Sequence, residues 1–252
     1  MGRKIAALKA TSRFGQSCIG EFIGTFMLVM IIVTAIGGGA GPHAPIAIGF
    51  GLTSLVFAYG YISKAQYTPA VTLALYINSV QDLKLTIAHM LVQVIAGVAA
   101  ALIGGSLIPS KEAFPQLAPR HDGVVASYDD SHAVARAFFA EVIFTFNLAH
   151  TILNVAASRQ AGNQFFGIAI GMAVLAGAYC TGSISGGSLN PAVTTGLHVG
   201  AAVYGVPGSG TKPIAYIWLY WAAELLGGTI AGLLFHFVDE EEENPDTYEA
   251  LS

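Results

Sequence analysis

Two short sequences of the same design lie far apart in the chain, Thr68-Pro69-Ala70 and Asn190-Pro191-Ala192. In each, a residue able to cap a helix precedes a proline, and proline fits the first helical turn because no backbone N–H is needed there. A helix N-terminus carries about half an elementary positive charge. The Asn190 amide and the Thr68 hydroxyl also have hydrogens to donate. These groups predict hydrogen bonding to small neutral molecules and repulsion of cations.

Acidic residues lie inside apolar stretches at matched places in the two halves of the chain, at Glu21 and Glu141. An ionisable side chain in a membrane core is costly, so it usually has a partner or a role. One interpretation is a proton relay. We favour the other, in which each carboxylate accepts hydrogen bonds from a non-helical loop of its own half. Gln93 and Glu224 are expected to help in the same way.

The sequence predicts no metal site, no cofactor and no catalytic centre. Its two cysteines, Cys18 and Cys180, lie in neither a CxxC pair nor a metal-ligand spacing. The histidines form no paired motif, and no nucleophile stands beside a suitable base. There is also no basic face that would bind a nucleic acid. These features argue against an enzyme and against nucleic-acid partners.

The composition is typical of a protein embedded in a lipid bilayer. Of the 252 residues, 54% are hydrophobic and 10% are charged, and the mean hydropathy is +0.63. Soluble domains carry about 25% charged residues. A spanning helix needs about 20 mostly apolar residues. Six stretches qualify: Cys18–Gly37, Ala44–Ser63, Leu85–Leu107, Val134–Ala156, Phe165–Ser183 and Pro213–Val238.

Two further apolar stretches, Pro69–Ser79 and Pro191–Val203, are too short to span, and each opens with the proline described above. They are predicted to be half-length helices that begin inside the membrane. Non-helical backbone at that depth is tolerated only where it lines a watery cavity or is buried in protein. The two short helices therefore predict a passage or a site between the halves of the chain.

The two halves repeat each other. Ile46-Ala47-Ile48-Gly49 recurs as Ile168-Ala169-Ile170-Gly171, and Thr68-Pro69-Ala70-Val71-Thr72 recurs as Asn190-Pro191-Ala192-Val193-Thr194, both 122 residues later. Each half has three spans, an odd number, so the second half enters the membrane from the opposite side. The predicted fold is an all-α membrane protein with six transmembrane helices and two re-entrant half-helices, arranged as an inverted repeat.

These features together resemble the aquaporin or major intrinsic protein family over nearly the whole chain. The resemblance rests on the paired Pro-Ala-Val-Thr sequences, on the Glu-x-x-x-Thr-Phe starts at Glu21 and Glu141, and on the pattern of six spans and two half-helices. It implies a right-handed helical bundle, usually a homotetramer with one pore per subunit. It also implies a central constriction formed by two groups of residues: Thr68, Pro69 and Ala70, and Asn190, Pro191 and Ala192.

The chain departs from the family at two places. The first box normally reads Asn-Pro-Ala, whereas this chain has Thr68 in place of the asparagine. Counted from the boxes, the four selectivity-filter positions of the family fall on Ile48, Ala178, Gly187 and Val193. None of these is the aromatic residue, histidine or arginine of the usual water-selective filter. A wider, more apolar opening without a fixed charge is expected to be less selective.

We expect three parts along the chain. Residues 1–16 are a cytoplasmic arm, residues 17–238 are one channel domain, and residues 239–252 are an acidic cytoplasmic tail that we expect to be disordered. The first repeat covers about 17–108 and the second about 133–238. Seven Lys and Arg residues fall on the side of the termini and four on the opposite side, which favours cytoplasmic termini in an undetermined membrane.

The expected function is a passive channel for water, with glycerol, urea, ammonia and hydrogen peroxide as further candidates. Ions and protons would be excluded by the half-helix dipoles. Thr194 and Thr195 follow Val193, where the family's glycerol channels often carry Asp, which argues mildly against a dedicated glycerol facilitator. A secondary transporter and a junction protein with a closed pore are the alternatives, because inverted repeats also describe transporters and because the first box is altered.

Overall fold

The computed structural model describes residues 2–127, 129–206 and 214–242, and nearly all of these residues are helical or in short connections. The α-helices of these ranges are α1 (Gly2–Gly37), α2 (Ala44–Ser63), α3 (Pro69–Ile77), α4 (Leu83–Leu107), α5 (Ser131–Ala156), α6 (Phe166–Thr181), α7 (Pro191–Tyr204) and α8 (Ile217–Glu242). Short 3-10 turns, η1 (Gly41–His43), η2 (Lys111–Ala113) and η3 (Arg159–Gly162), lie between helices. Strands β1 (Arg120–His121) and β2 (Val124–Val125) pair antiparallel.

The helix lengths separate spanning helices from half-helices. Within the described ranges, five helices are long and apolar enough to cross a membrane, namely α1, α2, α4, α5 and α8. The sixth predicted span is the shorter apolar helix α6, which has 16 residues because it ends at Thr181 before the glycine-containing loop that follows. Helices α3 and α7 have 9 and 14 residues, so they are the predicted half-helices. The all-α fold is confirmed.

The structure adds detail at both ends of the chain. Residues 2–16 of the predicted arm are helical, because α1 begins at Gly2 and runs without a break to Gly37. The acidic tail was expected to be disordered from residue 239 onward. Instead α8 continues through its first four residues to Glu242, and residues 243–252 lie outside the described part.

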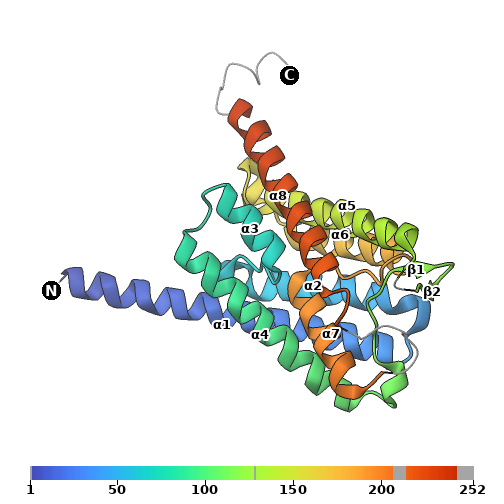
Figure 1. The fold of residues 1–252 in the computed structure, drawn as a ribbon. Helices are drawn as coiled ribbons and strands as arrows, with labels where there is room; N and C mark the ends of the chain where they lie inside the picture. The colour runs from blue at the N-terminus through green and yellow to red at the C-terminus, as the bar shows by residue number, and fades with distance from the viewer. Residues whose placement is uncertain (1, 128, 207–213, 243–252) are drawn as a thin grey trace.

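The contacts between helices have the paired pattern expected of an inverted repeat, and Figure 1 labels the helices that make them. In the first half α1 packs against α4 and α2, and in the second half α5 packs against α8 and α6. The half-helices cross between halves, since α3 packs against α8 and α7 packs against α4. Contacts between α2 and α6 and between α3 and α7 join the halves at the centre. Each half-helix is therefore held largely by the opposite repeat.

Two matched glycines let the half-helices approach the spanning helices closely. A Cβ at Gly97 of α4 would lie 2.4 Å from the carbonyl oxygen of Ala192, and a Cβ at Gly228 of α8 would lie 2.4 Å from that of Ala70. Both neighbours are backbone atoms, which cannot swing aside as a side chain does. Small residues at helix crossings are the usual way in which helices pack tightly in lipid.

The faces that point away from this centre are apolar. Large hydrophobic side chains are exposed on the spanning helices of both halves, including Ile19, Phe50, Tyr61, Phe139 and Phe237. In water such a surface would be unfavourable, but lipid tails solvate it. The polar buried side chains instead cluster around the two half-helices, which is where the site lies.

We predict that Gly97→Ala destabilises the protein while Gly15→Ala does not. The added methyl at position 97 meets the Ala192 backbone, and such overpacking costs about 1–3 kcal/mol. A Cβ at Gly15 meets no atom within 4 Å. The apparent melting temperature of each variant in detergent tests this, with wild-type protein beside it. Equal melting of the two variants would contradict the close crossing.

Candidate functional site

Each half-helix is preceded by a loop whose backbone adopts an uncommon conformation. Lys64, Ala65 and Tyr67 in the first half have φ angles of 68°, 49° and 55°. The matching positions of the second half, Gly186, Gly187 and Leu189, have φ angles of 94°, 71° and 56°. Residues other than glycine rarely take positive φ, and each instance costs on the order of 1–3 kcal/mol. The loops therefore need support from their surroundings.

In the first half this support comes from Glu21, which is fully buried. Its Oε1 accepts hydrogen bonds from the backbone N–H of Gln66 at 2.9 Å and from the Ser63 hydroxyl at 2.6 Å. Its Oε2 accepts from the backbone N–H of Tyr67 at 2.7 Å and from the Gln93 side-chain amide at 2.8 Å. Both carboxylate oxygens therefore accept hydrogen bonds, and the loop is bound to α1 through two consecutive backbone N–H groups.

Glu141 makes the equivalent contacts in the second half and is also fully buried. Its Oε1 accepts from the Ser185 hydroxyl at 2.6 Å and the Ser188 N–H at 3.0 Å, and its Oε2 accepts from the Leu189 N–H at 2.7 Å. Charge-assisted hydrogen bonds of this kind are about twice as strong as neutral ones. This geometry favours a structural role over a proton relay.

The third spans differ between the halves. Gln93 donates to Glu21 and to the Thr72 hydroxyl. Its counterpart Glu224 can only accept when ionised, and its Oε1 receives the Asn190 N–H at 3.0 Å and the Thr194 hydroxyl at 2.8 Å. The other oxygen of Glu224 has no hydrogen-bond partner within the described ranges.

The two boxes meet at the centre of the molecule. Thr68 caps α3, its hydroxyl oxygen accepting the Ala70 N–H at 3.3 Å, and Asn190 caps α7, its Oδ1 accepting the Ala192 N–H at 2.9 Å. The Nδ2 of Asn190 donates to the Tyr67 carbonyl oxygen at 2.9 Å, which joins the two repeats. The sequence predicted that this amide faces the lumen. One of its two hydrogens is used across the repeats, which leaves one for a passing molecule.

A cavity of about 240 Å³ runs from the loops on one face to these boxes. Thr68 and Asn190 line it, and so do all four predicted filter positions, Ile48, Ala178, Gly187 and Val193. Its wall is mostly aliphatic, with Leu28, Ile32, Leu52, Ile152, Ile170 and Leu197 among the lining residues. Pro69, Ala70, Pro191 and Ala192 are buried beside the cavity and are not part of its lining.

The mouth of the cavity is covered by the connection between α4 and α5. The N–H groups of Ala118 and Arg120 donate to the carbonyl oxygens of Ser185 and Ile184, at 3.2 and 2.8 Å. This ties the connection to the second re-entrant loop. Arg120 and Gln116 are among the residues that line the same cavity as the filter positions.

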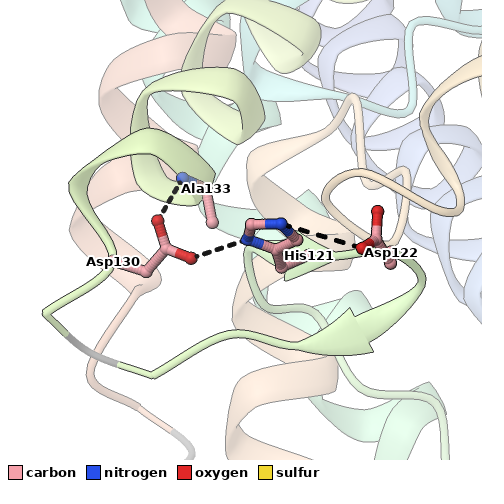
Figure 2. A network of polar contacts seen from close by, with 4 residues as sticks. All are labelled: His121, Asp122, Asp130 and Ala133. Carbon is pink, nitrogen blue, oxygen red and sulfur yellow. Dashed lines mark hydrogen bonds and ion pairs between the residues drawn. The ribbon is translucent and has the colours of Figure 1, made fainter.

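A polar network holds the β-hairpin of this connection against the start of α5 (Figure 2). His121 Nδ1 lies 3.1 Å from a carboxylate oxygen of Asp130, whose other oxygen caps α5 by accepting the Ala133 N–H at 2.9 Å. The Ala133 hydrogen bond, and then that of His121, lower the pKa of the Asp130 carboxyl. His121 also lies 3.8 Å from the exposed carboxylate of Asp122.

Sequence reasoning missed two residues of the site. The ring of Tyr67 fills the space beside Gly24, and its hydroxyl donates to the Leu55 carbonyl oxygen at 2.9 Å. Its own carbonyl oxygen accepts the hydrogen bond from the Asn190 side chain. Its position just before the first box was a signal, but nothing in the sequence paired it with Gly24. Arg120 is one of the four Lys and Arg residues on the side opposite the termini, and no spacing in the sequence links it to the boxes.

We predict opposite outcomes for two isosteric changes. Glu141→Gln places an NH₂ group against a backbone N–H, because both oxygens of Glu141 accept, and an unmet buried donor costs about 1–3 kcal/mol. Glu224→Gln keeps the accepting oxygen and changes only the atom without a partner. Glu141→Gln should lower the apparent melting temperature in detergent and Glu224→Gln should not. An equal loss in both variants would contradict this reading.

Comparison with known proteins agrees with this geometry. The sequence profile of the major intrinsic protein family matches residues 8–235. Aquaporin NIP3-1 of Oryza sativa is 31% identical over 90% of this chain and 69% of its own length. Glycerol uptake facilitator protein-like 6 of Lactiplantibacillus plantarum is 28% identical over 89% of this chain and 98% of its own.

A solved structure shows the same fold at lower identity. The aquaglyceroporin from Plasmodium falciparum superposes with a TM-score of 0.71 and 18% identity, over 88% of this chain and 96% of the other. At that identity the likeness concerns the fold alone. Because the family profile covers nearly all of the sequence, and the paired half-helices and their supporting carboxylates lie as described, the chain belongs to the major intrinsic protein family.

Proposed function

We propose that this protein is a passive channel with a broad filter, which passes water and small uncharged solutes up to about the size of glycerol and excludes ions. The observation that carries the proposal is the cavity itself, which joins the four filter positions to the two box residues Thr68 and Asn190. Membership of the family supports the channel, and the chemistry of the lining supports the breadth of the filter.

The filter positions favour larger neutral solutes because they are small or aliphatic and uncharged. Val193 stands where the resemblance expects arginine, and Gly187 and Ala178 add little bulk. The aliphatic wall would contact the carbon side of a polyol, while Thr68, Asn190 and loop carbonyl groups serve its hydroxyls. A relative named as a glycerol uptake facilitator is consistent with this, although Thr194 and Thr195 argue against a channel dedicated to glycerol.

Exclusion of cations would rest on the two half-helix N-termini. Thr68 and Asn190 cap α3 and α7 and line one cavity, so the positive ends of both helices face the same passage. The pairs Pro69–Ala70 and Pro191–Ala192 belong to the constriction as its support, because they form the first turns of those helices without lining the passage themselves. Glu21 and Glu141 act by fixing the loops, not by carrying protons.

The proposal extends to assembly and orientation. We infer a homotetramer with one pore in each subunit, supported by the resemblance and by the apolar outer faces of the helices. We place both termini in the cytoplasm on the excess of Lys and Arg on that side. The proposal assigns the chain no enzymatic reaction. A transporter would need a coupling ion bound in the passage, and the acids that we identify are engaged with the loops.

Osmotic shrinkage of proteoliposomes tests the function directly. We expect water, glycerol and urea to cross faster than in protein-free liposomes, without saturation and without dependence on an ion gradient. Saturable, ion-linked flux would indicate a transporter, and no change would indicate a closed scaffold. Passage of water without any larger solute would contradict the broad filter.

We predict that Val193→Arg converts the filter to one that prefers water. The guanidinium adds bulk and a fixed positive charge at a lining position, so glycerol flux should fall by about tenfold while water flux falls less. Val193→Met adds bulk without charge and is the matched control. Stopped-flow measurement of the glycerol-to-water ratio checks this. An unchanged ratio in Val193→Arg would mean that position 193 is not part of the filter.

A further inference from the structure

We propose that Arg120 is the charge-selecting residue of the pore mouth, supplying from the α4–α5 connection the fixed positive charge that the filter ring lacks. The inference rests on the proposed channel function and names a further specificity-determining residue of the same passage. Among the residues that line the cavity and that the structure describes, Arg120 carries the one fixed positive charge. The four ring positions are uncharged.

The backbone around Arg120 is fixed against the second re-entrant loop. Its own N–H donates to the Ile184 carbonyl oxygen at 2.8 Å, and the Ala118 N–H donates to that of Ser185 at 3.2 Å. On the other side of the contact, a Cβ at Gly186 would lie 3.0 Å from the Gln116 carbonyl oxygen. The backbone of Arg120 is therefore held in a fixed position relative to the loop that contains filter position Gly187. This keeps the positive charge at the mouth of the cavity.

The guanidinium is oriented by neutral acceptors. Its Nη2 donates to the Gln116 carbonyl oxygen at 3.1 Å and its Nη1 donates to that of Gly123 at 3.2 Å. Its Nε is buried and has no hydrogen-bond partner within the described ranges. No carboxylate in these ranges forms an ion pair with it. The positive charge is thus held in place without being neutralised.

The β1–β2 hairpin further fixes the position of Arg120. Arg120 pairs with Val125 across β1 and β2, and the next residue, His121, is tied to Asp130 at the start of α5 (Figure 2). Asp122 and Asp130 contact His121, and neither forms an ion pair with the guanidinium of Arg120. A cation entering the mouth would therefore meet a positive charge that is not paired with a carboxylate before it reached the half-helix ends, while a neutral solute would meet hydrogen-bond donors.

The test compares a small cation with a neutral solute in proteoliposomes. Methylammonium uptake at about pH 6, where the amine is protonated, is measured beside water and glycerol flux for wild type and variants. Arg120→Gln keeps donors but removes the charge, so methylammonium uptake should rise about tenfold while water flux stays within about twofold. Arg120→Lys should restore exclusion. Arg136→Gln, on the exposed face of α5, is the matched control and should behave as wild type.

The outcomes separate this inference from the proposed function. Wild-type protein that passes no water and no glycerol would refute the channel. A wild-type channel whose Arg120→Gln variant still excludes methylammonium would refute the role of Arg120. Equal methylammonium uptake in Arg120→Gln and Arg120→Lys would mean that Arg120 has only a structural role and would refute charge selection.

A second variant guards against misfolding of Arg120→Gln. Gln116→Glu leaves the arginine in place and sets a carboxylate among the lining residues of the same mouth. It should raise methylammonium uptake by partial neutralisation, in the same direction as Arg120→Gln. Uptake equal to that of wild type in this folded variant would also overturn the proposal.

Discussion

The passage depends on two buried carboxylates that hold strained loops. Each loop presents a run of positive φ angles, which in the first half includes the non-glycine residues Lys64, Ala65 and Tyr67. Glu21 and Glu141 offset this strain by accepting two consecutive backbone N–H groups each. A buried carboxylate is costly unless its oxygens are hydrogen-bonded, and a buried loop is costly unless its N–H groups are. Each feature therefore requires the other.

From this constraint the rest of the centre follows. Fixed loops set where α3 and α7 begin, and the caps Thr68 and Asn190 then line one cavity. The half-helices pack on the opposite repeats through Gly97 and Gly228, so neither half of the passage forms without the other. The hydrogen bond from Asn190 to the Tyr67 carbonyl oxygen is the direct link between them. The site therefore needs both repeats, because each half-helix is held by contacts with the other repeat.

The symmetry between the two halves is incomplete around the cavity. The first box has a hydroxyl where the second has an amide, and Gln93 of the first half corresponds to Glu224 of the second. Outside the constriction, a long connection is present on one face, and it brings Arg120 to the cavity. This connection joins the two repeats and is therefore not itself repeated. The framework is therefore shared by the halves, and the differences between them lie in the boxes, in the residues that support them and in the connection that reaches the cavity.

The sequence alone determined the parts whose cause is local or periodic. The lengths of the apolar stretches predicted the spans. The prolines and capping residues predicted where the half-helices begin, and the 122-residue repeat predicted the inverted arrangement. The acids Glu21 and Glu141 stood out because charge is rare in apolar runs. Only the tertiary structure decided the contacts of Tyr67 and Arg120, as well as the early end of α6. Those depend on packing between segments far apart in the chain, which no spacing within one segment encodes.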